Sequence, residues 1–251
     1  MPITSSDLVW YGSLNMPEDN SSTTGGDIDE EVKISFTDLA ANDNVTVISS
    51  AGGDTMNITI TGLLVDGTLD TDVITLNGTT RVLGAKTFER ILKITLASAA
   101  TGTVTVTRDN ATTYTTIATL EPGILEVRSL FYNASAEANG GSSRDYYEKV
   151  FVKNEHGSLT LNSATIVEFS DPGAVITFDL EDAKNSDNST ASRLNTAPTS
   201  MLSSFSNSDK TVPDGYLEAG SYQGIWLKLT LASGTVASKN TYSLHLTGTT
   251  T

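Results

Sequence analysis

Hydrophobic and polar residues alternate along much of this chain, and a two-residue period is the pattern of half-buried β-strands. The clearest run extends from Met56 to Leu96 and opens with MNITIT, in which every second side chain is apolar. Asp66-Gly67 interrupts the run, and Asn77-Gly78 is a dipeptide that tolerates the positive φ angles of a tight hairpin. The pattern therefore predicts a meander of several strands in this region.

Similar strands of four to nine residues, separated by turn signals, continue through the rest of the chain. They predict an all-β fold of two β-sandwich domains, Ig-like or jelly-roll-like, preceded by an extended N-terminal arm. We assign residues 1–27 to the arm, 28–122 to the first sandwich and 123–251 to the second, because Pro122-Gly123 is a strand-stopping pair. Within the second sandwich, residues 182–215 are predicted to form a long polar loop, which in a compact domain usually marks function or disorder.

Composition narrows the classes of function. The net charge of −15 repels phosphate backbones and argues against nucleic acid as a partner. The chain has no cysteine, which excludes disulfides, thiolate metal sites and cysteine nucleophiles. It has no run of about 18 apolar residues that would span a membrane, and MPITSSDLVWYGS lacks the basic and apolar parts of a secretory signal. We expect a soluble protein that is made in a cytoplasm and does not contact membranes.

The N-terminal arm contains one apolar cluster in otherwise polar chain, formed by Leu8, Val9, Trp10 and Tyr11. A Ser/Gly-rich tail follows it and has no apolar face with which to offset its ordering entropy. The arm is therefore either a disordered terminus or a segment that docks on a neighbouring subunit or partner. Two adjacent aromatic residues favour docking, since such side chains anchor interfaces.

Catalytic and metal-binding patterns are weak. His156 in a turn and His245 on a strand are interpreted as solvent-facing, and no G-x-S-x-G elbow or phosphate-binding glycine loop is present. The best metal candidate is the carboxylate cluster from Asp66 to Asp72, but it lacks the D-x-D-x-D-G spacing, and Asp is common in hairpin loops. A carboxylate pair for glycoside hydrolysis stays open, although aromatic residues make up only 7% of the chain. We predict no catalytic residue, cofactor or metal ligand.

Three segments resemble stretches of structural proteins of tailed-bacteriophage virions. They are the opening MPITSSDLVWYGS with NMPED, the segment VITLNGTTRVLGAKTFERILKI, and the segment YYEKVFVKNEHGSLTLNSATI. The resemblance implies a non-enzymatic virion component, specifically a capsid decoration (cement) protein on the outer shell. It implies the major capsid protein as partner. The open edge strands of a sandwich, with Tyr242 to Leu246 expected near an edge, predict a homo-oligomer, and family analogy favours a trimer.

Two other classes of function compete with this one. A receptor- or carbohydrate-binding β-module of a phage tail or fibre would have the same acidic, cysteine-free composition. An enzyme is the third class, although the residues give it the least support. Under the first interpretation, the protein is made in the host cytoplasm and ends on the capsid surface of the virion.

Overall fold

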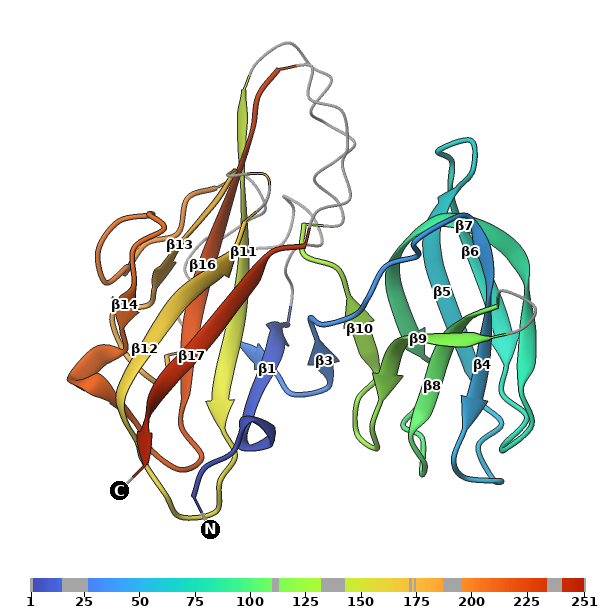
Figure 1. The fold of residues 1–251 in the computed structure, drawn as a ribbon, viewed down its shortest axis with the longest axis horizontal. Coiled ribbons are helices and arrows are strands. Elements are labelled where there is room, and N and C mark those ends of the chain that lie inside the picture. The colour runs from blue at the N-terminus through green and yellow to red at the C-terminus, as the bar shows by residue number, and fades with distance from the viewer. Residues whose placement is uncertain are drawn as a thin grey trace. The chain divides into compact units, whose positions relative to one another are not determined.

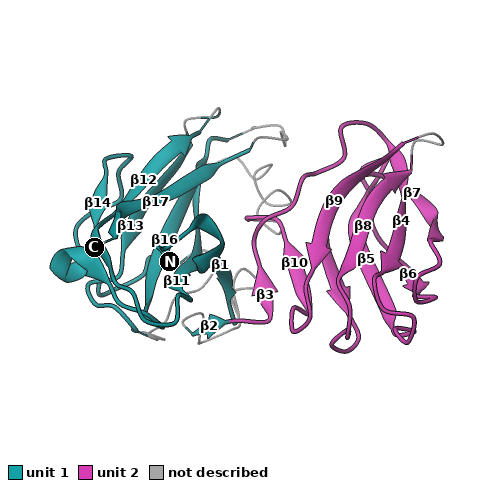
Figure 2. Ribbon diagram, turned by 60° about the horizontal axis from the view of Figure 1, so that its bottom comes forward, with its two compact units in different colours: residues 1–29, 133–251 teal, residues 30–132 magenta. Residues whose placement is uncertain are grey.

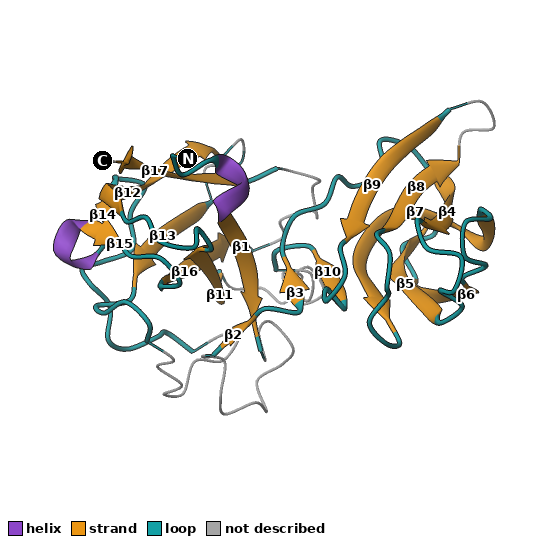
Figure 3. Cartoon of the chain, turned by 90° about the horizontal axis from the view of Figure 1, so that it is seen from below, coloured by secondary structure: helices purple, strands orange, loops and turns teal. Residues whose placement is uncertain are grey.

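The computed structural model describes residues 2–14, 27–109, 113–131, 143–171, 173, 175–186, 196–233 and 241–250. Over these residues the fold is all-β, as predicted, and the helical turns are the short 3₁₀ helices η1 (Ser5–Asp7) and η3 (Pro213–Gly215) (Figure 3). The chain divides into two compact units (Figure 2). Unit 1 comprises Met1–Asp29 and Asn133–Thr251, and unit 2 comprises Glu30–Tyr132.

Unit 2 is a single curled sheet that forms a half-barrel. Its strands are β3 (Val32–Lys33), β4 (Asp43–Ser49), β5 (Asn57–Leu64), β6 (Leu69–Thr75), β7 (Val82–Leu96), β8 (Val104–Asp109), β9 (Tyr114–Leu120) and β10 (Glu126–Arg128). The order is β3-β10-β7-β4-β8-β9, and β5 pairs with both β6 and β7. The long strand β7 curls the sheet, because its first half pairs with β4 and its second half with β5 and β10.

The core of unit 2 follows the predicted alternation. On β5, Ile58 and Ile60 are fully buried, whereas Asn57 is exposed. Asn77-Gly78 does lie in a tight turn, but Asn77 bridges to Thr80, so the two central residues are Gly78 and Thr79, and of these Gly78 has a positive φ, +51°. Residues with 0% exposure come from β4, β5, β7, β8 and β9: Val45, Val47, Ile58, Ile60, Phe88, Ile91, Ile94, Val104, Val106 and Leu120.

Unit 1 contains two antiparallel sheets (Figure 1). Its strands are β1 (Leu8–Ser13), β2 (Ile28–Asp29), β11 (Arg144–Asn154), β12 (Leu161–Ser170), β13 (Ile176–Leu180), β14 (Lys210–Thr211), β15 (Tyr216–Leu217), β16 (Tyr222–Leu231) and β17 (Ser243–Thr250). The first sheet has the order β13-β16-β11-β1-β2. The second is built on β12, which pairs with β14, β15 and β17.

The central strands β11 and β16 are buried on both faces. Residues directly opposite each other in antiparallel strands point to the same face. One face therefore carries the row Lys149, Trp226 and Asp179, and the next row, with Val150 opposite Ile225, points to the other face. Both faces of this sheet bury polar side chains, because Glu148 and Gln223 lie on the same face as Val150 and Ile225 and are fully buried.

The N-terminal segment differs from the predicted extended arm of residues 1–27. Its part Leu8–Ser13 is strand β1, which pairs along β11 from Leu8 opposite Asn154 to Gly12 opposite Val150. Residues 15–26 lie outside the described part. The sequence alone did not indicate this pairing, because the partner strand lies more than a hundred positions away, as the bond between Tyr11 and Glu155 at a separation of 144 illustrates.

The boundary between the units also differs from the predicted one at Pro122. Pro122-Gly123 forms a turn inside unit 2, where Gly123 has a φ of +98° and the Ile124 N–H donates to the Glu121 carbonyl at 2.9 Å. Strand β10 follows this turn and pairs with β7 of the same sheet. A strand-stopping pair ends a strand, but it does not decide whether the next strand rejoins the same sheet.

Much of the predicted long loop 182–215 is built into unit 1, although residues 187–195 lie outside the described part. Ser206 and Phe178 exchange two backbone hydrogen bonds of 3.1 Å, which places this segment beside β13. The chain then forms β14, which pairs with β12 of the other sheet. The polar composition of this segment predicted a loop, whereas the segment forms irregular edge pairing that connects the two sheets.

Candidate interaction surface

Strand β17 is an open edge in the described part of unit 1. It pairs with β12 and with no other described strand (Figure 1). Proteins usually block such edges with charged residues, proline or bulges. Ser243–Thr250 contains no Asp, Glu, Lys, Arg or Pro. Both register shifts insert their extra residue on β12, so β17 itself runs without a bulge. An edge with these properties can accept a further strand from a partner.

A stacked aromatic pair lies on the same sheet. The rings of Phe169 and His245 have centroids 4.2 Å apart and an interplanar angle of 14°. Phe169 is 69% exposed, the largest exposure among the exposed large hydrophobic side chains of the described residues. An exposed apolar ring of this kind is a usual anchor in protein and ligand interfaces.

Two buried polar groups lie at the same end of the sheet. Burial raises the pKa of the Tyr242 phenol, and the nearby carboxylates of Glu168 and Asp171 raise it further. Burial followed by the charge of Asp171 likewise raises the pKa of Glu168. Among the described residues, neither the Tyr242 hydroxyl nor Glu168 Oε2 has a hydrogen-bond partner. This end of the β12–β17 sheet thus combines exposed rings with polar groups that can still form hydrogen bonds.

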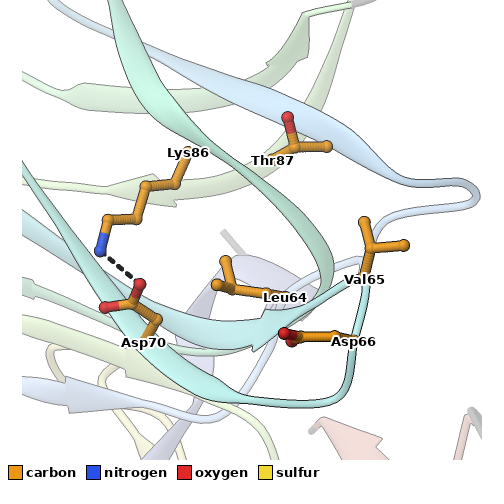
Figure 4. Close-up of a pocket in the computed structure, with 6 residues that line it drawn as sticks. All are labelled: Leu64, Val65, Asp66, Asp70, Lys86 and Thr87. Carbon is orange, nitrogen blue, oxygen red and sulfur yellow. Dashed lines mark hydrogen bonds and ion pairs between the residues drawn. The ribbon is translucent and has the colours of Figure 1, made fainter.

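A second surface feature is a shallow groove of about 530 Å³ in unit 2 (Figure 4). Its lining residues come from the β5–β6 hairpin and from β7: Leu64, Val65, Asp66, Asp70, Lys86 and Thr87. The groove begins where the pairing of β5 with β7 ends, at Leu64 opposite Phe88. Lys86 and Asp70 form an ion pair along the groove, and each of these side chains is 35% exposed.

The carboxylates of the candidate metal site accept hydrogen bonds from nearby backbone N–H groups. Asp66 accepts the Thr68 N–H at 2.9 Å, as expected for a hairpin loop. Asp72 accepts the N–H groups of Ala85 and Lys86 at 2.7 and 3.0 Å and so holds the irregular part of β7. Within the described ranges, no group of three His, Asp or Glu side chains is placed to hold a metal ion.

The predicted docking residues Leu8, Val9, Trp10 and Tyr11 lie together on β1, where the first three are half-buried and Tyr11 is buried. The Tyr11 hydroxyl donates to Glu155 Oε1 at 2.5 Å. Contacts within the chain therefore account for the burial of this cluster, and contact with a partner stays a prediction.

The two histidines have different environments. His156 Nδ1 accepts the N–H groups of Ser158 and Leu159 at 3.2 and 3.0 Å, so this half-buried side chain organises its turn. His245 is exposed on β17, as predicted. Its stacking on Phe169 was not predicted, because the register of β12 against β17 creates that contact. The only sequence signal was a lone aromatic residue at an exposed strand position.

Comparisons with protein-family models, with curated proteins and with solved structures found no match. The resemblance to virion proteins therefore stays a prediction. No helix in the described ranges has the length and apolar character needed to cross a membrane.

Proposed function

We propose that this protein is a non-enzymatic structural component of a tailed-bacteriophage virion that binds the outer capsid shell and stabilises it. The family resemblance of the three sequence segments suggests this function. The observation that best supports a binding role is the long strand β17, which is uncharged and has an open edge in the described part of unit 1. Backbone groups on such an edge can pair with a strand of the major capsid protein or of another copy of this chain.

The charge of the protein makes this edge the preferred place for contact. At a net charge of −15, the chain is repelled by any similarly acidic surface, including its own copies. Contacts through Ser243–Thr250 place no like charges opposite each other. Binding through this strand therefore avoids most of that repulsion, and it suits a homo-oligomer, for which family analogy favours a trimer.

The test uses particles that carry the protein. Particles stripped of the protein and particles with the protein added back are heated in parallel, because a ligand that binds only the assembled shell stabilises it by mass action. We expect the decorated particles to melt at a higher temperature. Equal melting temperatures would contradict the cement function.

Strand β17 is then tested directly with a matched pair of variants. Thr247→Lys adds a charge to the open edge, and Thr115→Lys adds the same charge at an exposed position of β9 in unit 2. We expect Thr247→Lys to weaken attachment strongly and Thr115→Lys to leave it unchanged. Equal attachment of the two variants would show that β17 is not part of the interface. The cement function would still be tested by the melting temperatures.

A receptor- or carbohydrate-binding module of a tail or fibre is the second candidate, and the Phe169–His245 stack favours it. Sugar rings pack on exposed aromatic faces, and carboxylates such as Glu168 and Asp171 accept hydrogen bonds from hydroxyls. A glycan array probed with the native protein and with Phe169→Ala tests this candidate. Glycan binding that Phe169→Ala abolishes, together with no effect on capsid melting, would favour it over the cement function.

A further inference from the structure

Unit 1 buries a complete ion pair between its central strand β11 and the end of its edge strand β13. Lys149 of β11 and Glu181, at the end of β13, have side-chain exposures of 0% and 1%, and Nζ lies 2.5 Å from Oε1. Strand β16 separates β11 from β13 in the sheet. The pair therefore connects two strands across a third strand, out of contact with bulk water.

The surroundings of the pair are mainly aromatic. Lys149 Nζ lies 4.7 Å from the ring centroid of Phe151 and 5.5 Å from that of Trp226. Gly224 leaves the space for the carboxyl, because a Cβ atom there would lie 2.5 Å from Glu181 Oε2 and 2.9 Å from Lys149 Cε. Charges in such an environment lose their hydration and recover only part of its free energy from each other.

The hydrogen bonding of the carboxyl is incomplete. Glu181 Oε2 is buried and has no hydrogen-bond partner among the described residues, and the same is true of the Trp226 indole N–H. Burial raises the pKa of Glu181, although the charge of Lys149 acts in the opposite direction. A carboxyl with one bare oxygen in a dry site is costly, and such a group calls for an explanation.

A second buried pair in the same unit shows the usual solution. Asp179 accepts the Leu180 N–H and two hydrogen bonds from Ser203, all at 2.9 Å. Lys210 Nζ lies 3.6 Å from Asp179 and donates to Ser203 Oγ and to the Ser204 carbonyl at 2.9 and 2.8 Å. Both oxygens of Asp179 thus accept hydrogen bonds, whereas Glu181 Oε2 has no hydrogen-bond partner among the described residues.

We propose that Lys149 and Glu181 condense into an intramolecular amide bond. The Lys149 ammonium first gives a proton to the carboxylate, which the dry site favours because both groups become neutral. The amine lone pair attacks Cδ, the Nζ–Cδ bond forms, one Cδ–O bond breaks, and the departing hydroxyl leaves as water with a proton from Nζ. No oxidant, reductant or co-reactant is required.

The same observations fit the product. The condensation removes both buried charges and one of the two carboxyl oxygens, so the remaining carbonyl needs fewer partners. The Trp226 N–H lies close enough to the carboxyl to lower the pKa of Glu181, and it is a nearby donor that can stabilise the oxyanion as the bond forms. The bond would join residues 32 positions apart and fix β11 to β13 across β16.

The intact mass of the denatured full-length protein tests the proposal, after allowance for removal of Met1. We expect the native chain to be lighter than its sequence by one water molecule, and Lys149→Arg to have its full mass because a guanidinium does not form the amide. Asp66-Gly67 and Asp214-Gly215 can also lose water by cyclisation, but that loss would persist in Lys149→Arg.

Fragmentation of a proteolytic digest then locates the bond. We expect a branched peptide that contains Lys149 and Glu181, and unmodified Lys210 as the internal control. A native chain of full mass, or a water loss that Lys149→Arg retains, would overturn the proposal. The result is independent of the proposed function, because it is read from the isolated chain without particles.

Discussion

The two units place polar groups in their interiors in different ways. Unit 2 buries single aspartates whose oxygens accept backbone and hydroxyl hydrogen bonds, as Asp54 does from Ser49, Thr101 and Gly102. Unit 1 buries whole lysine–carboxylate pairs, Lys149 with Glu181 and Lys210 with Asp179. A short aspartate can satisfy a loop locally, whereas a buried lysine needs a partner from another strand.

The difference follows from the architecture of each unit. In unit 2, one curled sheet encloses an apolar core, and its aspartates serve at loops and at irregular places in strands. In unit 1, a sheet buried on both faces needs a second cover, which the irregular segment around Met201 and Phe205 supplies by packing on Tyr147 and Trp226. The two buried lysine–carboxylate pairs of unit 1 therefore occur in the unit in which irregular chain covers a sheet.

The largest expected effect is a loss of stability in unit 1. Lys149→Met leaves Glu181 buried without its partner, and breaking a buried pair in this way costs about 3–5 kcal/mol. Both tryptophans, Trp10 and Trp226, lie in unit 1, so tryptophan fluorescence during urea unfolding reports this unit alone. The double variant Lys149→Met/Glu181→Leu should recover part of the loss. A single variant as stable as the native chain would contradict a coupled pair.

The corresponding variant in unit 2 truncates a buried side chain of its core. Phe88 on β7 is fully buried, and Phe88→Ala should cost about 3–5 kcal/mol through lost burial and a residual cavity. Circular dichroism should show early unfolding of part of the strand signal while the tryptophan transition stays in place. A simultaneous shift of both signals would mean that the two units unfold together.

Acid should affect the buried aspartates of unit 2 and the buried lysine–carboxylate pairs of unit 1 differently. Hydrogen bonds from Ser49 and then Thr101 hold the pKa of Asp54 well below its usual range. The stability this gives is fully present above the ordinary value of about 4 and is lost as the pH falls through it toward the lower folded value. We expect Asp54→Asn to flatten the fall of unit 2 stability in acid, measured as urea midpoints by circular dichroism.

Glu181 gives the opposite pH dependence if its carboxyl is free. A raised pKa in the folded state means that stability is present below the ordinary value of about 4.3 and is lost as the pH rises through the folded value. An amide at Glu181 has no carboxyl and no such dependence. A fluorescence-detected midpoint in unit 1 that changes with pH in this sense, and stops changing in Glu181→Gln, would count against the amide.

The smallest effect is expected in the groove of unit 2. The side chains of Lys86 and Asp70 are each about a third exposed, and solvent screens their attraction. Lys86→Met should therefore change the stability of unit 2 by less than about 1 kcal/mol. Urea unfolding at two salt concentrations measures this change. A larger loss of unfolding free energy would show that the pair stabilises unit 2 more than a surface ion pair does.

The sequence determined the local features of this protein. Alternation across Met56–Leu96 gave the strands of the meander, and Asn77-Gly78 gave their tight turn, because side-chain direction and turn geometry depend on neighbouring residues. The same rule placed Tyr147, Lys149 and Phe151 on one side of a strand, as the structure has them. It could not show that this side is buried.

The tertiary structure decided everything that depends on distant partners. It placed β1 beside β11 and so made unit 1 discontinuous in sequence, and it turned Pro122-Gly123 into a turn within one sheet. It also brought Glu181 to Lys149 and Phe169 to His245. Alternation states which face a residue occupies, but strand order and register decide what covers that face, and these arise from the packing of the whole chain.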